Sequence, residues 1–129
     1  MAMQRLPDAE LVVMQELWGM DTEATSAQIM ARLEGKREWT VTTVLTLLGR
    51  LAERGFLAIR KQGKVNVYRA LIEEEDYLAT ESASFLARLH GNSLTSLVSA
   101  LYGGKAISQS DLRELQLFID QEAKGGEVQ

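Results

Sequence analysis

The chain has 129 residues, of which 46% are hydrophobic and 25% are charged, and its formal net charge is -4. Such values are typical of one folded domain, or of two small ones that share a core, and they exclude a disordered or fibrous chain. The absence of cysteine excludes disulfide bonds, thiolate metal sites and a cysteine nucleophile. No apolar run is long enough to cross a bilayer, and the N-terminus lacks the apolar core of a signal peptide, so we expect a cytoplasmic protein without membrane insertion.

Charge is distributed unevenly along the chain. Residues 36–70 contain eight basic and two acidic side chains, a local net charge of +6. Residues 71–129 contain four basic and ten acidic side chains, a net charge of -6. Scattered charge usually marks a solvated surface. Here the segregation follows a change in structural pattern, so it favours a basic binding module joined to an acidic second module.

Two helices are predicted in the first 35 residues. Pro7 suits the first turn of the first helix, and Gly19 ends it. Its apolar stripe follows helical spacing: Leu11, Met14, Leu17 and Trp18. A second, short helix is predicted over residues 26–34, with Thr25 as its N-cap. Its inward-facing residues are Ile29, Met30 and Leu33.

The third predicted helix begins after Thr40, another N-cap candidate, and ends at Gly55. At about 100° per residue, one arc is apolar and is expected to face the core: Val41, Val44, Leu45, Leu48, Leu51 and Ala52. The opposite arc is polar and basic: Thr42, Thr43, Thr46, Arg50 and Arg54. Threonine is a poor helix former, and solvated helix faces usually carry Glu, Lys and Gln, so the threonines indicate a function for this face.

Two β-rich runs follow, at residues 56–60 and 65–70, around a turn at Gln62-Gly63. The tip of this hairpin carries Lys61 and Lys64, and Arg60 precedes them. Lysines there could simply protect a strand edge from aggregation. Directly after a threonine-rich helix, however, they favour the basic wing of a winged helix-turn-helix.

We therefore predict a DNA-binding site on the third helix and the hairpin. Short polar side chains in the major groove can contact base edges and thymine methyl groups, while flanking cations reach phosphates. We assign the threonines to the bases and the arginines of the helix to the phosphates. The predicted DNA-binding residues are Thr40, Thr42, Thr43, Thr46, Arg50, Arg54, Arg60, Lys61 and Lys64.

The rest of the chain is predicted to form three helices with apolar stripes. The first covers about residues 73–90, the second follows a cap at Asn92 or Ser93, and the third follows a cap at Ser108 or Ser110. Such a short segment makes a small core, so these helices either fold back onto the first module or interlock with a second copy. Because two-fold dimers are the commonest soluble assembly, we favour a homodimer.

The predicted fold is thus mainly α with a small β-hairpin wing. It comprises a winged helix-turn-helix over residues 1–71, a helical dimerisation region over residues 72–124 and a frayed tail over residues 125–129. The predicted dimerisation residues are Leu78, Phe85, Leu89, Leu94, Leu97, Val98, Leu101, Leu115 and Phe118.

The sequence offers little for an enzyme, a metal or a cofactor. His90 is the only histidine, and one histidine cannot build a His-rich metal site. The acidic run at residues 73–76 lacks the glycine and alternating spacing of a calcium loop. No catalytic triad, phosphate-binding glycine loop or paired carboxylates stand out, so we expect no enzymatic activity and no cofactor.

Several segments together carry a resemblance to a known family. They are AELVVMQELW at residues 9–18, ATSAQIM at 24–30, TVTTVLTLLGRLAERGFL at 40–57, VYRA at 67–70 and ASFLARLHGNSLTSLVSAL at 83–101. In this order and spacing the chain resembles the penicillinase-repressor family of β-lactam-resistance regulators, the BlaI/MecI type, from about Leu6 to Gln121. The resemblance implies a homodimeric repressor that binds palindromic operators in double-stranded DNA and silences resistance genes.

The resemblance also implies a means of control. In the β-lactam members a membrane-bound sensor protease responds to the drug, and the repressor is cleaved in its dimerisation region. The matching segment here is SLVSALYGG at residues 96–104, which places the cleaved bond at Ala100-Leu101, whereas the family's cleaved pair is Asn-Phe. Leu45 stands where a member has arginine, which implies a change in base reading. Copper-responsive relatives use Cys-x-Cys motifs, and this chain has no cysteine to sense copper in that way.

Two other functions stay open at the level of the sequence. A winged helix can bind a protein instead of DNA, although the basic charge on the third helix and wing argues against that. A winged-helix regulator can also respond to a small molecule, which needs a cavity between helices that the sequence does not reveal.

Overall fold

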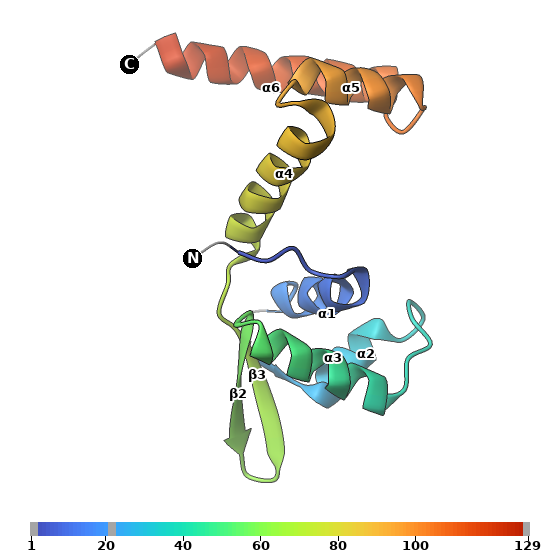
Figure 1. The fold of residues 1–129 in the computed structure, drawn as a ribbon, viewed down its shortest axis with the longest axis vertical. Helices are drawn as coiled ribbons and strands as arrows, with labels where there is room; N and C mark the ends of the chain where they lie inside the picture. The colour runs from blue at the N-terminus through green and yellow to red at the C-terminus, as the bar shows by residue number, and fades with distance from the viewer. Residues whose placement is uncertain (1–2, 21–22, 128–129) are drawn as a thin grey trace. The chain divides into compact units, whose positions relative to one another are not determined.

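The computed structural model describes residues 3–20 and 23–127, and the chain divides into two compact units, Met1–Glu81 and Ser82–Gln129 (Figure 1). The predicted fold class, mainly α with a small β-sheet, is confirmed. The elements of the first unit are α1 (Asp8–Trp18), β1 (Glu23–Thr25), α2 (Ser26–Leu33), α3 (Val41–Glu53), β2 (Leu57–Gln62) and β3 (Val65–Ala70). Helix α4 (Glu74–His90) begins in this unit and continues into the second.

The caps of α2 and α3 are those that the sequence predicted. The Thr25 hydroxyl accepts from the Gln28 N–H at 3.2 Å, and the Gln28 side chain accepts from the Thr25 N–H at 2.9 Å, which forms a capping box. The Thr40 hydroxyl accepts from the Thr43 N–H at 3.2 Å. After α3 the chain turns at Gly55, whose φ of +81° is a left-handed conformation that favours glycine.

The sheet is antiparallel with strand order β1-β3-β2, so it contains one strand that the sequence did not predict. Strand β1 pairs with β3, with Ala24 opposite Tyr68. Because β1 has only three residues, it is too short to display an alternating pattern of apolar and polar residues. Strand β2 runs to Gln62, which pairs with Val65, so the turn lies at Gly63-Lys64 and not at Gln62-Gly63. Gly63 supplies the positive φ that this tight turn requires.

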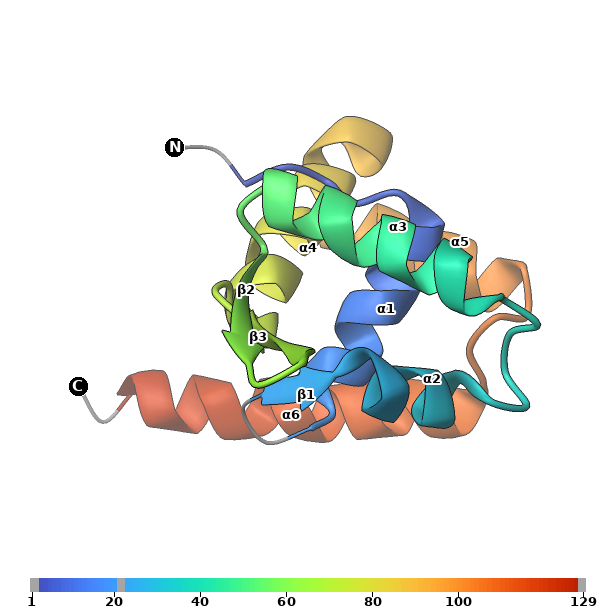
Figure 2. The ribbon, with the colours of Figure 1, turned by 90° about the horizontal axis from the view of Figure 1, so that it is seen from below.

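Helices α1, α2 and α3 pack against one another, and the sheet lies beside them (Figure 2). Helix α3 contributes four buried residues to the shared core, namely Val44, Leu47, Leu48 and Leu51. The prediction that Val41 and Leu45 face the core is wrong, because these side chains are 53% and 43% exposed. The buried arc of α3 is centred between Val44 and Leu48, so two apolar residues are left on its outer flank.

The start of α4 completes the core of the first unit. Tyr77 is 4% exposed, and its hydroxyl accepts from the Leu6 N–H at 2.9 Å. Its ring lies 5.7 Å from those of both Trp18 and Phe56, centroid to centroid. The Trp18 indole N–H also donates to the Ile72 carbonyl at 2.8 Å. These contacts place the division between the units at Glu81, beyond the predicted boundary at residue 71.

The second unit contains the rest of α4, with α5 (Leu94–Gly103) and α6 (Gln109–Glu127). Ser93 caps α5, and Ser108 caps α6 through a reciprocal pair of hydrogen bonds with Asp111. Helix α6 continues to Glu127, within the tail that the sequence predicts to be frayed, and residues 128–129 lie outside the described part. Among the described residues, no helix is both long and apolar enough to cross a membrane.

Candidate DNA-binding interface

The outer face of α3, the hairpin tip and the start of α2 lie around one hollow of about 350 Å³ in the first unit. Leu45 from α3 shares this hollow with Lys61 and Lys64 from the hairpin, so the fold brings together the two segments that the sequence singled out. The lining residues are Thr25, Ser26, Ala27, Leu45, Lys61, Lys64, Val65, Asn66 and Tyr68. Figure 2 shows the backbone of the elements that contribute these residues, namely α3, the β2–β3 hairpin, β1 and α2.

The threonines of α3 are less free to read bases than the sequence suggested. The hydroxyls of Thr40 and Thr43 lie 3.1 Å apart, and Thr40 also accepts the Thr43 N–H, so both serve the cap of the helix. The Thr46 hydroxyl donates to the Thr42 carbonyl at 2.9 Å. It therefore has oxygen lone pairs and a methyl group, but no free proton, to offer a base edge.

Three of the predicted cations are available to bind phosphates. Arg50, Lys61 and Lys64 are exposed, and none has a carboxylate within ion-pair distance among the side chains of residues 3–20 and 23–125. Arg60 differs, because it donates to Glu23 at 2.7 Å and to Gln62 at 3.1 Å. Since β1 and β2 are the outer strands, its bond to Glu23 crosses the central strand β3 and braces the sheet.

Arg54, which was predicted to contact phosphate, pairs with a buried carboxylate in the structure. Its Nε donates to Glu10 Oε1 at 2.6 Å, and one of its terminal nitrogens donates to the Gln4 amide oxygen at 2.9 Å. Glu10 is only 2% exposed. The guanidinium thus compensates a buried carboxylate on α1 and ties the end of α3 to that helix.

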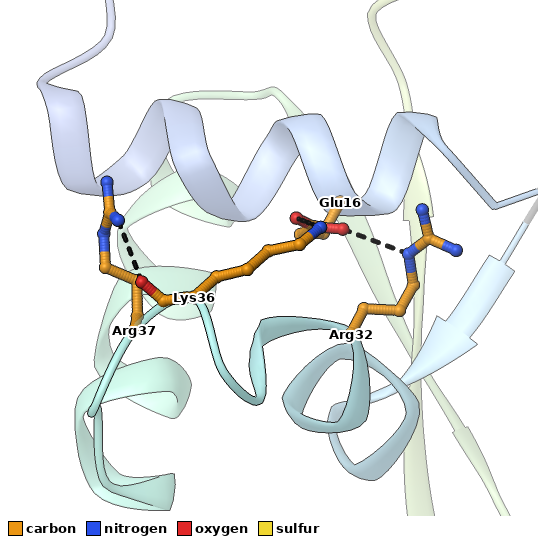
Figure 3. A network of polar contacts seen from close by, with 4 residues as sticks. All are labelled: Glu16, Arg32, Lys36 and Arg37. Carbon is orange, nitrogen blue, oxygen red and sulfur yellow. Dashed lines mark hydrogen bonds and ion pairs between the residues drawn. The ribbon is translucent and has the colours of Figure 1, made fainter.

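A second carboxylate fixes the helix-turn-helix from the other end of α1 (Figure 3). Glu16, nearly buried, accepts from Arg32 on α2 at 3.1 Å and from Lys36, in the segment before α3, at 2.9 Å. The hydrogen bond from Lys36 lowers the pKa of the Glu16 carboxyl below its ordinary value of 4.5; burial opposes this effect, and the bond from Arg32 adds to it. The pairs hold α1, α2 and the approach to α3 in one arrangement.

Sequence reasoning missed Glu10 and Glu16 as supports of the interface, although a signal was present. Glu10 lies three, four and seven residues before Val13, Met14 and Leu17, which is the spacing of the buried face of α1. A carboxylate on a buried helix face requires a cationic partner. The sequence could not say which cation.

The predicted dimerisation residues lie on α4, α5 and α6, and none of them is buried. Phe85, Leu97, Val98, Leu101 and Leu115 are half-buried, and Leu78, Leu89, Leu94 and Phe118 are exposed. Two further apolar side chains on α6 are exposed, namely Leu117, which is 62% exposed, and Ile119. Helices α5 and α6 also form an open, largely apolar hollow of about 340 Å³, lined by Leu94, Thr95, Val98, Ser99, Tyr102, Leu112, Leu115 and Ile119.

The Ala100-Leu101 bond lies inside the last turns of α5. The Ala100 carbonyl accepts from the Gly104 N–H at 2.9 Å, and the Leu101 carbonyl accepts from the Ala106 N–H at 2.8 Å. The carbonyl groups of both residues that form the bond are therefore hydrogen-bonded at the C-terminal end of the helix.

A family model described as penicillinase repressor matches residues 6–121. The chain belongs to the penicillinase repressor family. The penicillinase repressor of Bacillus licheniformis is 32% identical over 122 residues, which cover 92% of this chain and 94% of that protein. The methicillin resistance regulatory protein MecI of Mammaliicoccus sciuri is 29% identical over 115 residues, which cover 89% of this chain and 93% of that one.

Solved structures of penicillinase repressors agree with the fold of the first unit. The DNA-binding domain of the repressor BlaI is 33% identical and covers 60% of this chain and 94% of its own, with a TM-score of 0.52. The monomeric form of B. licheniformis BlaI, in complex with the blaP half-operator, is also 33% identical and covers 58% of this chain and 90% of its own, with a TM-score of 0.50. This member of the family is accordingly a DNA-binding transcriptional repressor with a winged helix-turn-helix, and the family is not enzymatic.

Proposed function

We propose that this repressor binds, as a homodimer, a two-fold symmetric operator of the kind that controls β-lactam-resistance genes. One observation carries the proposal: Leu45, Lys61 and Lys64 line a common hollow, and both lysines lack an acidic partner among the described residues. A surface with unneutralised cations beside an exposed helix suits a duplex, because phosphates bind the cations while the helix meets base edges.

In this proposal α3 lies in the major groove with its outer face toward the bases. Thr42 and Thr46 contact base edges, and Arg50, one further turn along the same row, reaches a phosphate. Lys61 and Lys64 contact the backbone next to the groove. Thr40, Thr43, Arg54 and Arg60 act indirectly, since their polar groups cap the helix or join elements of the unit.

The second unit supports the homodimer. No residue among 82–125 reaches the buried class, although α4, α5 and α6 carry many large apolar side chains. Exposed apolar surface of this extent is typical of an interface that a partner covers. A second copy provides the matching surface, and a two-fold dimer presents two winged helices to the two halves of a symmetric site.

Salt dependence tests the DNA-binding part of the proposal. Purified protein is titrated, across a series of salt concentrations, against duplexes from its own upstream region and against an unrelated duplex. We expect tight binding to one upstream duplex, and a steep loss of affinity between roughly 50 and 200 mM salt, because phosphate contacts release counterions. An affinity that did not change with salt concentration would favour a protein-interaction module instead.

Relief of repression by cleavage at Ala100-Leu101 is part of the same proposal. Cleavage would remove the end of α5 and all of α6 from the dimerisation region and so weaken the dimer. The two half-sites would then lose the effective concentration that joins them, a factor of about 10² to 10⁴. Proteases bind extended segments, so the last turn of α5 must open first. Mass spectrometry of the protein from induced cells tests this. An intact chain after induction would favour a bound small molecule as the signal.

A further inference from the structure

The outer face of α3 displays two large apolar side chains that the fold leaves uncovered. Val41 and Leu45 are 53% and 43% exposed, and they lie four residues apart, so they form one row along the helix. Leu45 lines the hollow beside Lys61 and Lys64. Leaving such side chains in water has a cost in free energy, which covering them by a partner would recover.

The first turns of α3 offer a restricted chemistry for reading bases. Residues 41–49 contain no Arg, Lys, Asn, Gln, Asp or Glu. Guanine is usually read by bidentate Arg or Lys and adenine by Asn or Gln, so this segment has no side chain for either contact. The Thr46 hydroxyl proton is bound to the Thr42 carbonyl, and the Thr43 hydroxyl contacts Thr40 in the cap, which reduces the polar groups further.

The thymine methyl group is the apolar feature that a major groove presents. We propose that Val41 and Leu45 determine the sequence specificity of this repressor by packing against thymine methyl groups in each half-site. The occupant is a duplex, because Arg50, Lys61 and Lys64 flank the apolar row without acidic partners in the described residues and complement phosphates. The inference rests on the proposed function and adds which base feature is read and by which residues.

The test compares thymine with uracil, which differ only by the methyl group. The full chain selects duplexes from a random pool amplified with dTTP. The selected duplex is then synthesised with single dT→dU replacements across each half-site and in the flanks. We expect one or two replacements per half-site to weaken binding by roughly threefold to fivefold each, as burial of one methyl group predicts, and flanking replacements to have no effect.

Variants assign the contact to residues. Leu45→Ala should bind the thymine duplex more weakly and should no longer distinguish thymine from uracil at one position of the half-site. Val41→Ala should lose the same distinction at another position. A double-mutant cycle, with the residue and the methyl group as its two changes, measures each contact. Leu71→Ala is the matched control, because Leu71 is an exposed leucine at the opposite end of the hairpin from the tip. It should keep the full discrimination.

The outcomes separate the two proposals. Equal binding of thymine and uracil duplexes by the wild type overturns the inference and leaves the operator-binding function standing. Discrimination that persists unchanged in both alanine variants overturns the assignment to Val41 and Leu45. Failure to select any duplex above the random pool overturns the proposed function, and the inference with it.

Discussion

Arg54 Nε donates to Glu10 Oε1 at 2.6 Å, and this bond joins residues 44 positions apart in the chain. The arginine ends the helix that meets DNA in our proposal, whereas the glutamate lies in the core beneath it. Arg54, the C-cap of α3, therefore supports the fold, whereas Arg50, within α3, is available to DNA.

Replacement of Arg54 should destabilise the first unit. Arg54→Ala leaves the carboxylate of Glu10 buried without its cation, and we expect the free energy of unfolding to fall by about 2 to 3 kcal/mol, since the arginine itself is partly exposed. Urea denaturation followed by circular dichroism measures this. Arg54→Ala combined with Glu10→Gln should recover part of the loss, and the absence of any recovery would contradict the pairing.

Replacement of Arg50 should reduce DNA affinity and leave the stability of the first unit nearly unchanged. Arg50 is exposed and has no acidic partner among the described residues, so Arg50→Ala should change the stability by no more than about 0.5 kcal/mol. Affinity should fall by a similar factor on all duplexes, and the salt slope should decrease by about two per dimer, one phosphate contact for each subunit. Loss of affinity for only one sequence would assign Arg50 to a base.

The Glu16 network predicts a pH-dependent stability. Because the pKa of Glu16 is lower in the folded chain than its ordinary value of 4.5, its contribution is fully present above that pH and is lost as the pH falls through the folded pKa. Glu16→Gln should therefore be clearly less stable than the wild type at about pH 6, and the difference should shrink at about pH 3. Glu34→Gln, at an exposed position, is the control and should show no such trend.

Gly49 lies on the same row of α3 as Val41 and Leu45, and a Cβ added there would meet nothing within 4 Å. Gly49→Ala should therefore raise the free energy of unfolding by about 0.5 to 1 kcal/mol, because alanine favours the helix. Operator affinity should fall, since the added methyl group would meet the groove. Gly55→Ala is the contrast, because its φ of +81° makes any side chain unfavourable, and it should destabilise the unit. Unchanged affinity in Gly49→Ala would mean that this part of α3 stays clear of DNA.

The proposed dimer depends on side chains that are exposed in one chain. Phe118 is 58% exposed on α6, so Phe118→Asp should be tolerated within the single chain but should bury an unpaired charge in a dimer. Sedimentation should show monomers, and circular dichroism should show an unchanged helical content. Gln116→Asp, an exposed polar position on the opposite face of the same helix, should stay dimeric. If Phe118→Asp also stayed dimeric, the interface would lie elsewhere.

Local pattern was sufficient to locate the helices and the hairpin. The caps at Thr25, Thr40, Ser93 and Ser108 act on backbone groups three residues away, so their signals are contained in a few adjacent letters. The order of those segments also carried the family resemblance, which the match over residues 6–121 confirms.

Tertiary structure alone decided which of the candidate residues are free to act. The sequence placed Arg50 and Arg54 on one polar arc, and only the fold gave Arg54 a buried partner on another helix. It likewise turned Val41 and Leu45 outward, because the buried arc of α3 depends on where α1 and the sheet contact it. Strand β1 exists because β3 offers it unpaired backbone groups, and three residues cannot signal such a partner in advance. Periodicity is a local property of the chain, whereas burial and pairing depend on segments that meet only after folding.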